Sequence, residues 1–206
     1  MNAARDYVTY AKLFDSALRS LTRRDHSVAE LRTKLQRKFA AQGVRQVLVP
    51  DHIWSDKQTE TPSQAYSLTS DLSNTHTSDS ASLIGSKQPI EDVMDHLLGE
   101  LEDQGLLDDA RFAEAFVRSR ANRGYGPIYI RQELRQKGLA DRIGGPVLDE
   151  YAGQWSDVAK SQVGRRFSDA EQDQKIWLKA YRFLQRRGFT GDHIKSALGR
   201  MPSQHG

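Results

Sequence analysis

The chain has 206 residues, of which 37% are hydrophobic and 28% charged, and its mean hydropathy is -0.68. No apolar run approaches the roughly 20 residues that a bilayer-spanning helix needs, so a membrane-spanning protein is excluded. The absence of cysteine excludes disulfide scaffolds, thiol nucleophiles and thiolate zinc sites, and the N-terminal residues lack a secretory signal pattern, so we expect a cytoplasmic location.

Charge is distributed unevenly along the chain, although the formal net charge is only +3. Residues 1–50 carry 10 basic and 4 acidic side chains, 90–110 carry 0 and 8, and 111–142 carry 8 and 3. The acidic block has no convergent spacing for a metal. Two interpretations remain for these carboxylates: they are solvated or paired within the chain, or they contact a basic partner.

The first half of the chain begins with two predicted helices. The first covers residues near 6–22, and the second begins near Val28, because Ser27-x-x-Glu30 is a capping box ahead of Leu31 and Leu35. Residues 44–89 differ, since helical periodicity is lost and Ser, Thr, Asp, Asn and Gln dominate from 55 to 87. We interpret 44–89 as a flexible polar insertion, with a small apolar island at its start.

Helical periodicity returns at Ile90 and continues towards the C-terminus. The next helix carries apolar residues at Ile90, Val93, Met94, Leu97, Leu98 and Leu101. It should end at Gly105, and Asp108 or Asp109 should cap the following helix. Pro127 suits the first position of a helix that ends at Gly138, and Thr190 suits the cap of the last helix. No strand pattern of comparable strength is present, so we predict an all-α fold.

Three segments resemble one another in sequence. They are Leu31–Phe39, Ile130–Gly138 and Ala180–Gly188, each with an apolar residue, a second one four positions later and a basic residue three positions beyond that. Without 44–89 the period is about 50 residues, which suits three short helices. We therefore predict three tandem three-helix repeats in an elongated, curved, solenoid-like molecule. The repeats are 1–43 plus 90–107, then 108–153, then 154–206.

Several strings in these repeats are similar to a known family. They are Arg24–Leu31, the run from Gly105 to Arg120, Arg123-Gly-Tyr-Gly-Pro127, Ile130–Gly138 and Phe183–Phe189. Together they resemble the RecX family of bacterial recombination regulators, everywhere except about 44–89. The resemblance implies three three-helix repeats, no catalytic activity, no cofactor, and modulation, mostly inhibition, of the RecA recombinase on DNA. It also implies a place in DNA recombination, DNA repair and the SOS response. We expect a monomer.

The residues themselves favour a basic surface, since a protein that binds filaments on DNA needs cations that neutralise phosphates. The candidates for contact with RecA or with single-stranded and possibly double-stranded DNA are Arg118, Arg120, Arg123, Tyr125, Arg131, Arg135, Lys137, Arg32, Lys34, Arg186 and Arg187. The alternative for the cations is a solvated helical face. Tyr125 could stack on a base, or it could only complete a turn between Gly124 and Gly126.

Enzyme motifs are missing from the sequence. The six His residues show no i, i+4 pair for zinc, and neither a phosphate-binding glycine loop nor a nucleophile elbow is present. We therefore expect no catalytic residue and no metal ligand. The rival interpretation is a stand-alone helical DNA-binding protein, transcriptional or architectural, because three-helix units with a basic helix resemble homeodomain-like readers.

Overall fold

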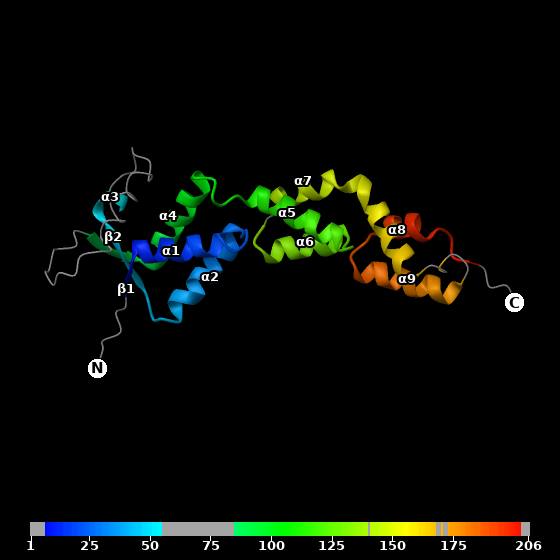
Figure 1. The fold of residues 1–206 in the computed structure, drawn as a ribbon, viewed down its shortest axis with the longest axis horizontal. Helices are drawn as coiled ribbons and strands as arrows, with labels where there is room; N and C mark the ends of the chain where they lie inside the picture. The colour runs from blue at the N-terminus through cyan, green and yellow to red at the C-terminus, as the bar shows by residue number, and fades with distance from the viewer. Residues whose placement is uncertain (1–6, 55–84, 140, 168–169, 171–172, 203–206) are drawn as a thin grey trace. The chain divides into compact units, whose positions relative to one another are not determined.

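The computed structural model describes residues 7–54, 85–139, 141–167, 170 and 173–202 (Figure 1). The chain divides into two compact units. The first consists of residues 1–20 and 34–100, and the second of residues 21–33 and 101–206. The first turns of the second helix therefore group with the C-terminal part of the chain.

The N-terminal part of the chain combines helices with a small sheet. Its elements are β1 (Tyr7–Thr9), α1 (Tyr10–Leu21), α2 (Val28–Ala40), β2 (Gln46–Pro50), α3 (Asp51–Trp54), β3 (Gly85–Pro89) and α4 (Ile90–Asp103). The sheet order is β1-β2-β3. β1 runs parallel to β2, with Val8 opposite Val47, and β3 runs antiparallel to β2, with Gln88 opposite Val47.

The apolar periodicity of α4 is confirmed. Ile90, Val93, Met94, Leu97, Leu98 and Leu101 are all buried. The helix ends at Asp103, and Gly105 has the left-handed φ of 68° that favours glycine after a helix.

The predicted capping box at the start of α2 is half formed. The Ser27 hydroxyl accepts a hydrogen bond from the Glu30 backbone N–H at 3.1 Å, as such a box requires. The Glu30 carboxylate does not complete the box, because it accepts from Arg24 and Lys137 instead. The start of the helix is nevertheless where the sequence predicts it.

The fold is mostly helical, as predicted, and it also contains a small sheet that the sequence did not indicate. Residues 46–50 and 85–89 lie within the predicted insertion, yet they pair with each other as β2 and β3. β2 does alternate, with Val47 and Val49 buried, but its pattern is only five residues long. β3, Gly-Ser-Lys-Gln-Pro, has no alternating apolar side chains that would indicate a strand.

The sheet also changes where the first helix begins. α1 begins later than predicted, because Tyr7–Thr9 joins β2 as a strand. The rest of the predicted insertion, 55–84, lies outside the described residues.

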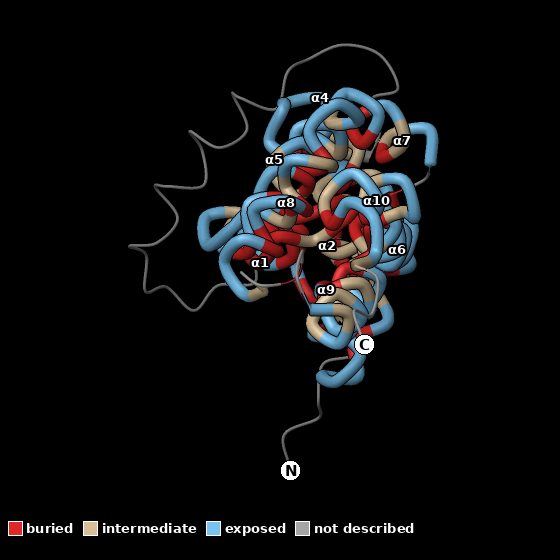
Figure 2. Tube along the Cα trace, turned by 90° about the vertical axis from the view of Figure 1, so that its right-hand side faces the viewer, coloured by how far each residue is buried: buried red, intermediate tan, exposed pale blue. Residues whose placement is uncertain are grey.

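The C-terminal part is helical throughout its described elements. They are α5 (Asp109–Asn122), α6 (Pro127–Gln136), α7 (Asp141–Glu150), η3 (Ala152–Gln154), α8 (Trp155–Arg166), α9 (Gln174–Arg186) and α10 (Gly191–Leu198). α5, α6 and α7 surround one hydrophobic core, which includes Phe112, Val117, Ile130 and Leu134. α8, α9 and α10 surround another, which includes Leu184. In Figure 2 the buried stretches lie where helices face one another, and the exposed stretches lie outside.

The predicted helix signals in this part are confirmed. The Asp108 side chain accepts hydrogen bonds from the Ala110 and Arg111 backbone N–H groups, both at 2.9 Å. Pro127 begins α6, and Thr190 caps α10. The caps at Asp108 and Thr190 satisfy N–H groups that have no partner within the helix itself.

Candidate nucleic-acid and protein interface

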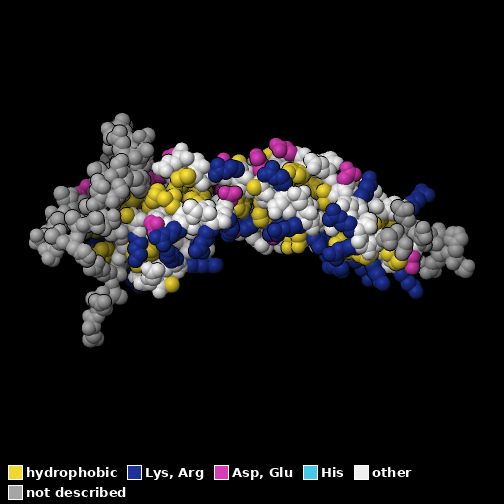
Figure 3. All heavy atoms as spheres, viewed as in Figure 1, with side chains coloured by type: hydrophobic (Ala, Val, Ile, Leu, Met, Phe, Trp, Pro, Cys, Tyr) yellow, Lys and Arg dark blue, Asp and Glu magenta, His cyan; other side chains and the backbone are white. Residues whose placement is uncertain are grey.

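The predicted basic residues lie on four helices and on the turns that follow them. Figure 3 shows Lys and Arg side chains spread over the face in view, with a concentration over α9. Of the predicted residues, Arg118, Arg123, Arg131, Arg135, Lys34 and Arg186 are exposed, whereas Arg120, Lys137, Arg32, Arg187 and Tyr125 are half-buried. Four of the half-buried residues have specific partners within the chain, which give them a structural role: Arg120, Tyr125, Lys137 and Arg187.

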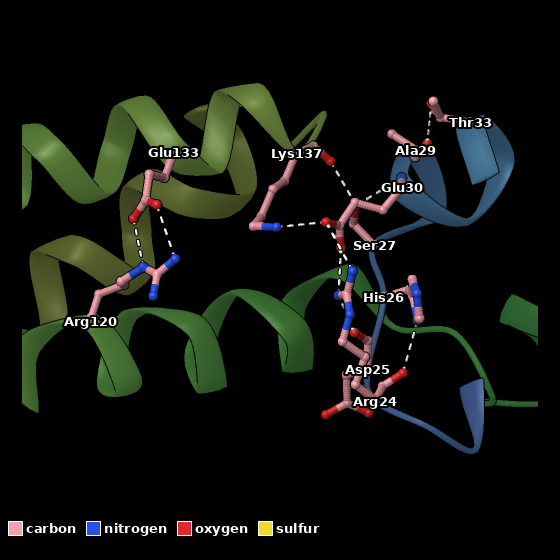
Figure 4. Close-up of polar contacts among 10 residues, drawn as sticks. All are labelled: Arg24, Asp25, His26, Ser27, Ala29, Glu30, Thr33, Arg120, Glu133 and Lys137. Atoms are coloured by element: carbon pink, nitrogen blue, oxygen red, sulfur yellow. Dashed lines mark hydrogen bonds and ion pairs between the residues drawn. The ribbon is translucent and has the colours of Figure 1, made fainter. Parts of the chain in front are cut away.

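Arg120 on α5 is paired with Glu133 on α6. Its Nε and Nη2 atoms donate to the two carboxylate oxygens at 2.6 and 3.0 Å, which is a bidentate ion pair (Figure 4). The guanidinium also lies 4.7 Å from the centroid of the Phe116 ring. Because both charged groups are only about one fifth exposed, the pair joins α5 to α6 in a partly dry environment.

Lys137 follows α6 and binds Glu30 of α2. Its Nζ atom donates to the Glu30 carboxylate at 2.6 Å and lies 5.2 Å from the Phe116 ring centroid (Figure 4). Arg24 donates to the same carboxylate at 3.1 Å. Burial alone would raise the pKa of Glu30, but the hydrogen bonds and charges of Arg24 and Lys137 outweigh it and lower that pKa. This carboxylate is therefore charged and held at neutral pH.

The start of α2 also contacts the turn after α6 and the start of α5, through two hydrogen bonds that each join a main-chain atom to a side chain. The Ser27 hydroxyl donates to the Lys137 carbonyl at 2.6 Å, and the Val28 N–H donates to the Asp109 carboxylate at 3.0 Å. Gly138, in that turn, has a φ of 77°, and a Cβ there would lie 2.3 Å from the Cβ of Ala29. Only glycine fits this approach without strain.

The start of α6 contacts the turn after α9 in a similar way, here through two hydrogen bonds between backbone atoms. The Gly126 N–H donates to the Arg187 carbonyl at 2.7 Å, and the Ile128 N–H donates to the Gly188 carbonyl at 3.0 Å. Gly188 has a φ of 82°, and a Cβ there would lie 2.4 Å from the Tyr129 backbone nitrogen. Two junctions thus use one arrangement: a basic residue and a glycine close a helix, and the start of another helix docks on them.

Arg187 and Tyr125 belong to this second junction. The Arg187 guanidinium lies 4.5 Å from the Tyr125 ring centroid and 5.1 Å from that of Phe183, and it donates to the Arg123 carbonyl at 3.1 Å. Tyr125 also stacks on Tyr129, with 4.5 Å between centroids. These contacts support the turn-and-packing interpretation of Tyr125.

Three predicted cations of the middle repeat are exposed and make no ion pair with any carboxylate among the described residues: Arg118, Arg123 and Arg131. Arg135 is exposed too, but it binds Asp141 at 2.6 Å. Each partner stabilises the charged form of the other, so the pKa of Asp141 is lowered and that of Arg135 is raised. The predicted basic residues of the middle repeat thus include some that are held in intrachain ion pairs and others that are exposed without one.

The structure extends the basic surface of the third repeat beyond the residues that the sequence indicates. Lys175, Lys179, Arg182 and Arg186 are all exposed and follow one another along α9 at i, i+4, i+7 and i+11. The sequence also indicates Arg182 and Arg186 as basic residues that recur in the third repeat, so Lys175 and Lys179 are the two members that it did not reveal. The helical spacing of the four cations is readable in the sequence, and it is the signal that could have revealed the set. We call these four residues the α9 stripe.

The acidic block is arranged around α4 and the turn after it. Burial raises the pKa of Glu102, and the nearby Asp109 and Asp103 carboxylates raise it further. Within the residues that the structure describes, no group of three or more His, Asp or Glu side chains is placed to hold a metal ion. Nor is any helix among them long and apolar enough to cross a bilayer.

Three family models match the chain in order. They are described as "RecX, first three-helix domain" for residues 14–49, "RecX, second three-helix domain" for 108–143 and "RecX, third three-helix domain" for 154–198. The chain belongs to the RecX family. This finding confirms the resemblance and the three three-helix repeats, and the RecX repeats fall on the helices that carry the basic residues.

Curated RecX relatives agree over about half of the chain. A "Regulatory protein RecX" of Halorhodospira halophila is 46% identical over 102 residues, which are 49% of this chain and 63% of that protein. That of Chromohalobacter salexigens is 40% identical over 102 residues, 50% of this chain and 67% of the relative. The aligned part of the chain thus spans about two thirds of the length of these relatives. The names of these relatives support a regulatory role.

Two solved RecX structures share the fold. The crystal structure of a regulatory protein RecX aligns with a TM-score of 0.57 at 18% identity, covering 92% of this chain and 72% of the other. That of RecX from Lactobacillus salivarius aligns with a TM-score of 0.55 at 19% identity, covering 95% and 96%. At these identities the likeness concerns the fold alone.

Proposed function

We propose that this RecX-family chain binds the RecA–DNA nucleoprotein filament and lowers the recombinase and ATPase activity of RecA. The observation that carries the proposal is the match of three RecX domains, in order, to the repeats that bear the exposed cations. A cytoplasmic monomer without catalytic activity of its own is part of this proposal. So is a role in recombination, DNA repair and the SOS response.

The proposed action requires only a difference in affinity. A ligand that binds all states of a filament equally shifts none of them, whereas one that prefers an inactive or disassembling state lowers activity. Within the middle repeat, Arg118, Arg123 and Arg131 are the predicted site residues best suited to contact the filament, because their side chains are exposed and form no ion pair with described residues. The half-buried cations Arg120, Lys137 and Arg187 support that surface by joining helices.

The deciding experiment measures RecA ATPase on single-stranded DNA with increasing amounts of this protein. We expect inhibition, and we expect the double variant Arg118→Ala with Arg131→Ala to inhibit less. The matched control is Arg19→Ala with Lys160→Ala, which removes the same charge from exposed pairs with Asp15 and Asp157. The control should inhibit like the parent. ATPase activity unchanged at saturating parent protein would contradict the proposal.

The rival, a stand-alone DNA-binding protein, predicts a different pattern. It requires tight binding to a particular duplex sequence without RecA, with each mismatched base pair costing about 1–3 kcal/mol. The proposed regulator should instead show no preference among duplex sequences and should associate more tightly with RecA filaments than with naked DNA. Selection of duplex sites from a random pool separates the two.

A further inference from the structure

The third repeat contains a regular line of positive charge along α9. With about 100° of rotation per residue, the four side chains of the α9 stripe fall within about 60° of arc on the helix. Lys175 and Arg186 are 11 positions apart, so the stripe extends over about 16 Å. The buried residues Ala180 and Leu184 lie on the opposite side of the helix. The stripe therefore faces away from the core that anchors α9.

Nothing acidic compensates this charge within α9. The helix sequence from Gln174 to Arg186 contains no Asp or Glu, and none of the four stripe cations forms an ion pair with a carboxylate of the described residues. The middle repeat differs, because Arg120 binds Glu133 and Arg135 binds Asp141. Evenly spaced like charges repel one another, and an anionic partner removes that repulsion.

Further arginines extend the stripe at its C-terminal end. The Arg166 guanidinium of α8 lies 5.3 Å from the Phe183 ring centroid, and that of Arg187 lies 5.1 Å from the same ring. Arg186, at the end of the stripe, is the neighbour of Arg187 in sequence. One aromatic ring of α9 thus has two guanidinium groups against it, and the positive charge continues from the helix onto the adjacent α8.

We infer that the α9 stripe binds the sugar–phosphate backbone of nucleic acid directly, without reading its sequence and without RecA. Neighbouring cations on one helix face are about 5–6 Å apart, and a polynucleotide strand offers a continuous row of single negative charges. Lys and Arg that neutralise phosphates release condensed counterions, which drives such binding whatever the bases are. An acidic protein surface is the competing partner, and the experiment below separates it from nucleic acid.

This inference rests on the proposed function for its biological role, because a stripe that binds DNA would help to keep the regulator on the RecA–DNA filament. Its failure is nevertheless separable from a failure of that function. DNA binding can be measured with no RecA present, and RecA inhibition can be measured with the same variants. A parent protein that binds DNA through α9 but leaves RecA unaffected would refute only the proposed function.

The test measures the affinity of the full-length chain for a fluorescent oligothymidylate and for a mixed-sequence duplex, over about 50 to 200 mM salt. The variant is Lys179→Ala with Arg182→Ala, at the centre of the stripe. Each lost phosphate contact should reduce the slope of log affinity against log salt by about 0.7 for the single strand and about 0.9 for the duplex. At about 0.1 M salt, two lost contacts correspond to a roughly 25-fold weaker affinity for the single strand.

Two controls keep the result interpretable. The variant Arg19→Ala with Lys160→Ala removes two positive charges elsewhere and should bind DNA like the parent. Far-UV circular dichroism should show an unchanged fold for the stripe variant, because substitutions at exposed positions rarely disturb folding. Parental DNA affinity and salt slope in the stripe variant would overturn the inference. Unchanged DNA affinity with lost RecA inhibition would also overturn it, and would assign the stripe to an acidic protein surface.

Discussion

The junction between α2 and α6 predicts a specific coupling between Gly138 and Ala29. Gly138→Ala places a Cβ 2.3 Å from the Ala29 Cβ, far inside van der Waals contact, at a backbone φ of 77°. The left-handed conformation costs a non-glycine residue about 1–2 kcal/mol. Overpacking typically adds about 1–3 kcal/mol. We therefore expect Gly138→Ala to lower the free energy of unfolding by about 2–5 kcal/mol.

Ala29→Gly in the same chain should remove the overlap, because the next nearest atom, the Ala29 Cα, is 3.8 Å from that Cβ. Alone it costs up to about 1 kcal/mol, the difference between glycine and alanine in a helix. In the Ala29→Gly background, Gly138→Ala should cost only the backbone term of about 1–2 kcal/mol. The double-mutant cycle should thus give a coupling energy of about 1–3 kcal/mol.

The assay is urea unfolding of the four proteins, followed by far-UV circular dichroism. Gly105→Ala is the reference for the backbone term, since Gly105 has a φ of 68° and a Cβ there would meet nothing within 4 Å. The predicted overlap with Ala29 is refuted if Gly138→Ala lowers the free energy of unfolding by no more than Gly105→Ala does. It is also refuted if Gly138→Ala costs the same in both backgrounds, within about 0.5 kcal/mol.

Other predictions concern single side chains of the second unit. Glu30→Gln should destabilise the protein by about 1–3 kcal/mol at neutral pH, because Lys137 loses its partly buried partner. The lowered pKa of Glu30 means that this stability is present above its ordinary pKa of about 4.3 and is lost as the pH falls through the folded-state value. Thermal unfolding of parent and variant should therefore converge in acid, and a constant difference would contradict the assignment. Burial lowers the pKa of His193, whose Nδ1 accepts from the Thr190 N–H at 3.4 Å, so the parent should lose stability as the pH falls from about 6.5. His193→Gln keeps an acceptor and should flatten that profile in thermal denaturation; an identical pH dependence would refute the role of His193. Leu134→Asp puts a charge at a side chain that is 1% exposed and should unfold its repeat at a cost of several kcal/mol, seen as lost circular dichroism. Parental stability there would show that the buried face is assigned wrongly.

The helices of the repeats could be predicted because their signals are local. Asp108, Pro127 and Thr190 each act within one turn of a helix start, and the apolar spacing of α4 is visible within a dozen residues. The sheet could not be predicted in this way. β3 consists of Gly-Ser-Lys-Gln-Pro, and only its pairing with β2, across 34 intervening residues, makes it a strand. Tertiary pairing there outweighs local preference.

The sequence does not show which of the predicted basic residues are exposed and which are held in intrachain pairs. Arg120 and Arg118 are two positions apart and look alike in sequence, yet one binds Glu133 and the other is exposed. That difference depends on which acidic side chain of another helix lies opposite each arginine. The start of the α9 stripe was missed for another reason, since the internal repeat begins only at Ala180 and leaves out the first half of the helix.

The two junctions differ in how they constrain change in the sequence over time. The contact of α6 with the turn after α9 uses the Arg187 and Gly188 carbonyls and the Gly126 and Ile128 N–H groups, which are present whatever side chains surround them. The contact of α2 with the turn after α6 also depends on the Ser27 hydroxyl, the Asp109 carboxylate and the Glu30–Lys137 ion pair. The first contact therefore tolerates drift of the surrounding side chains, whereas the second persists only where both partners are kept or change together.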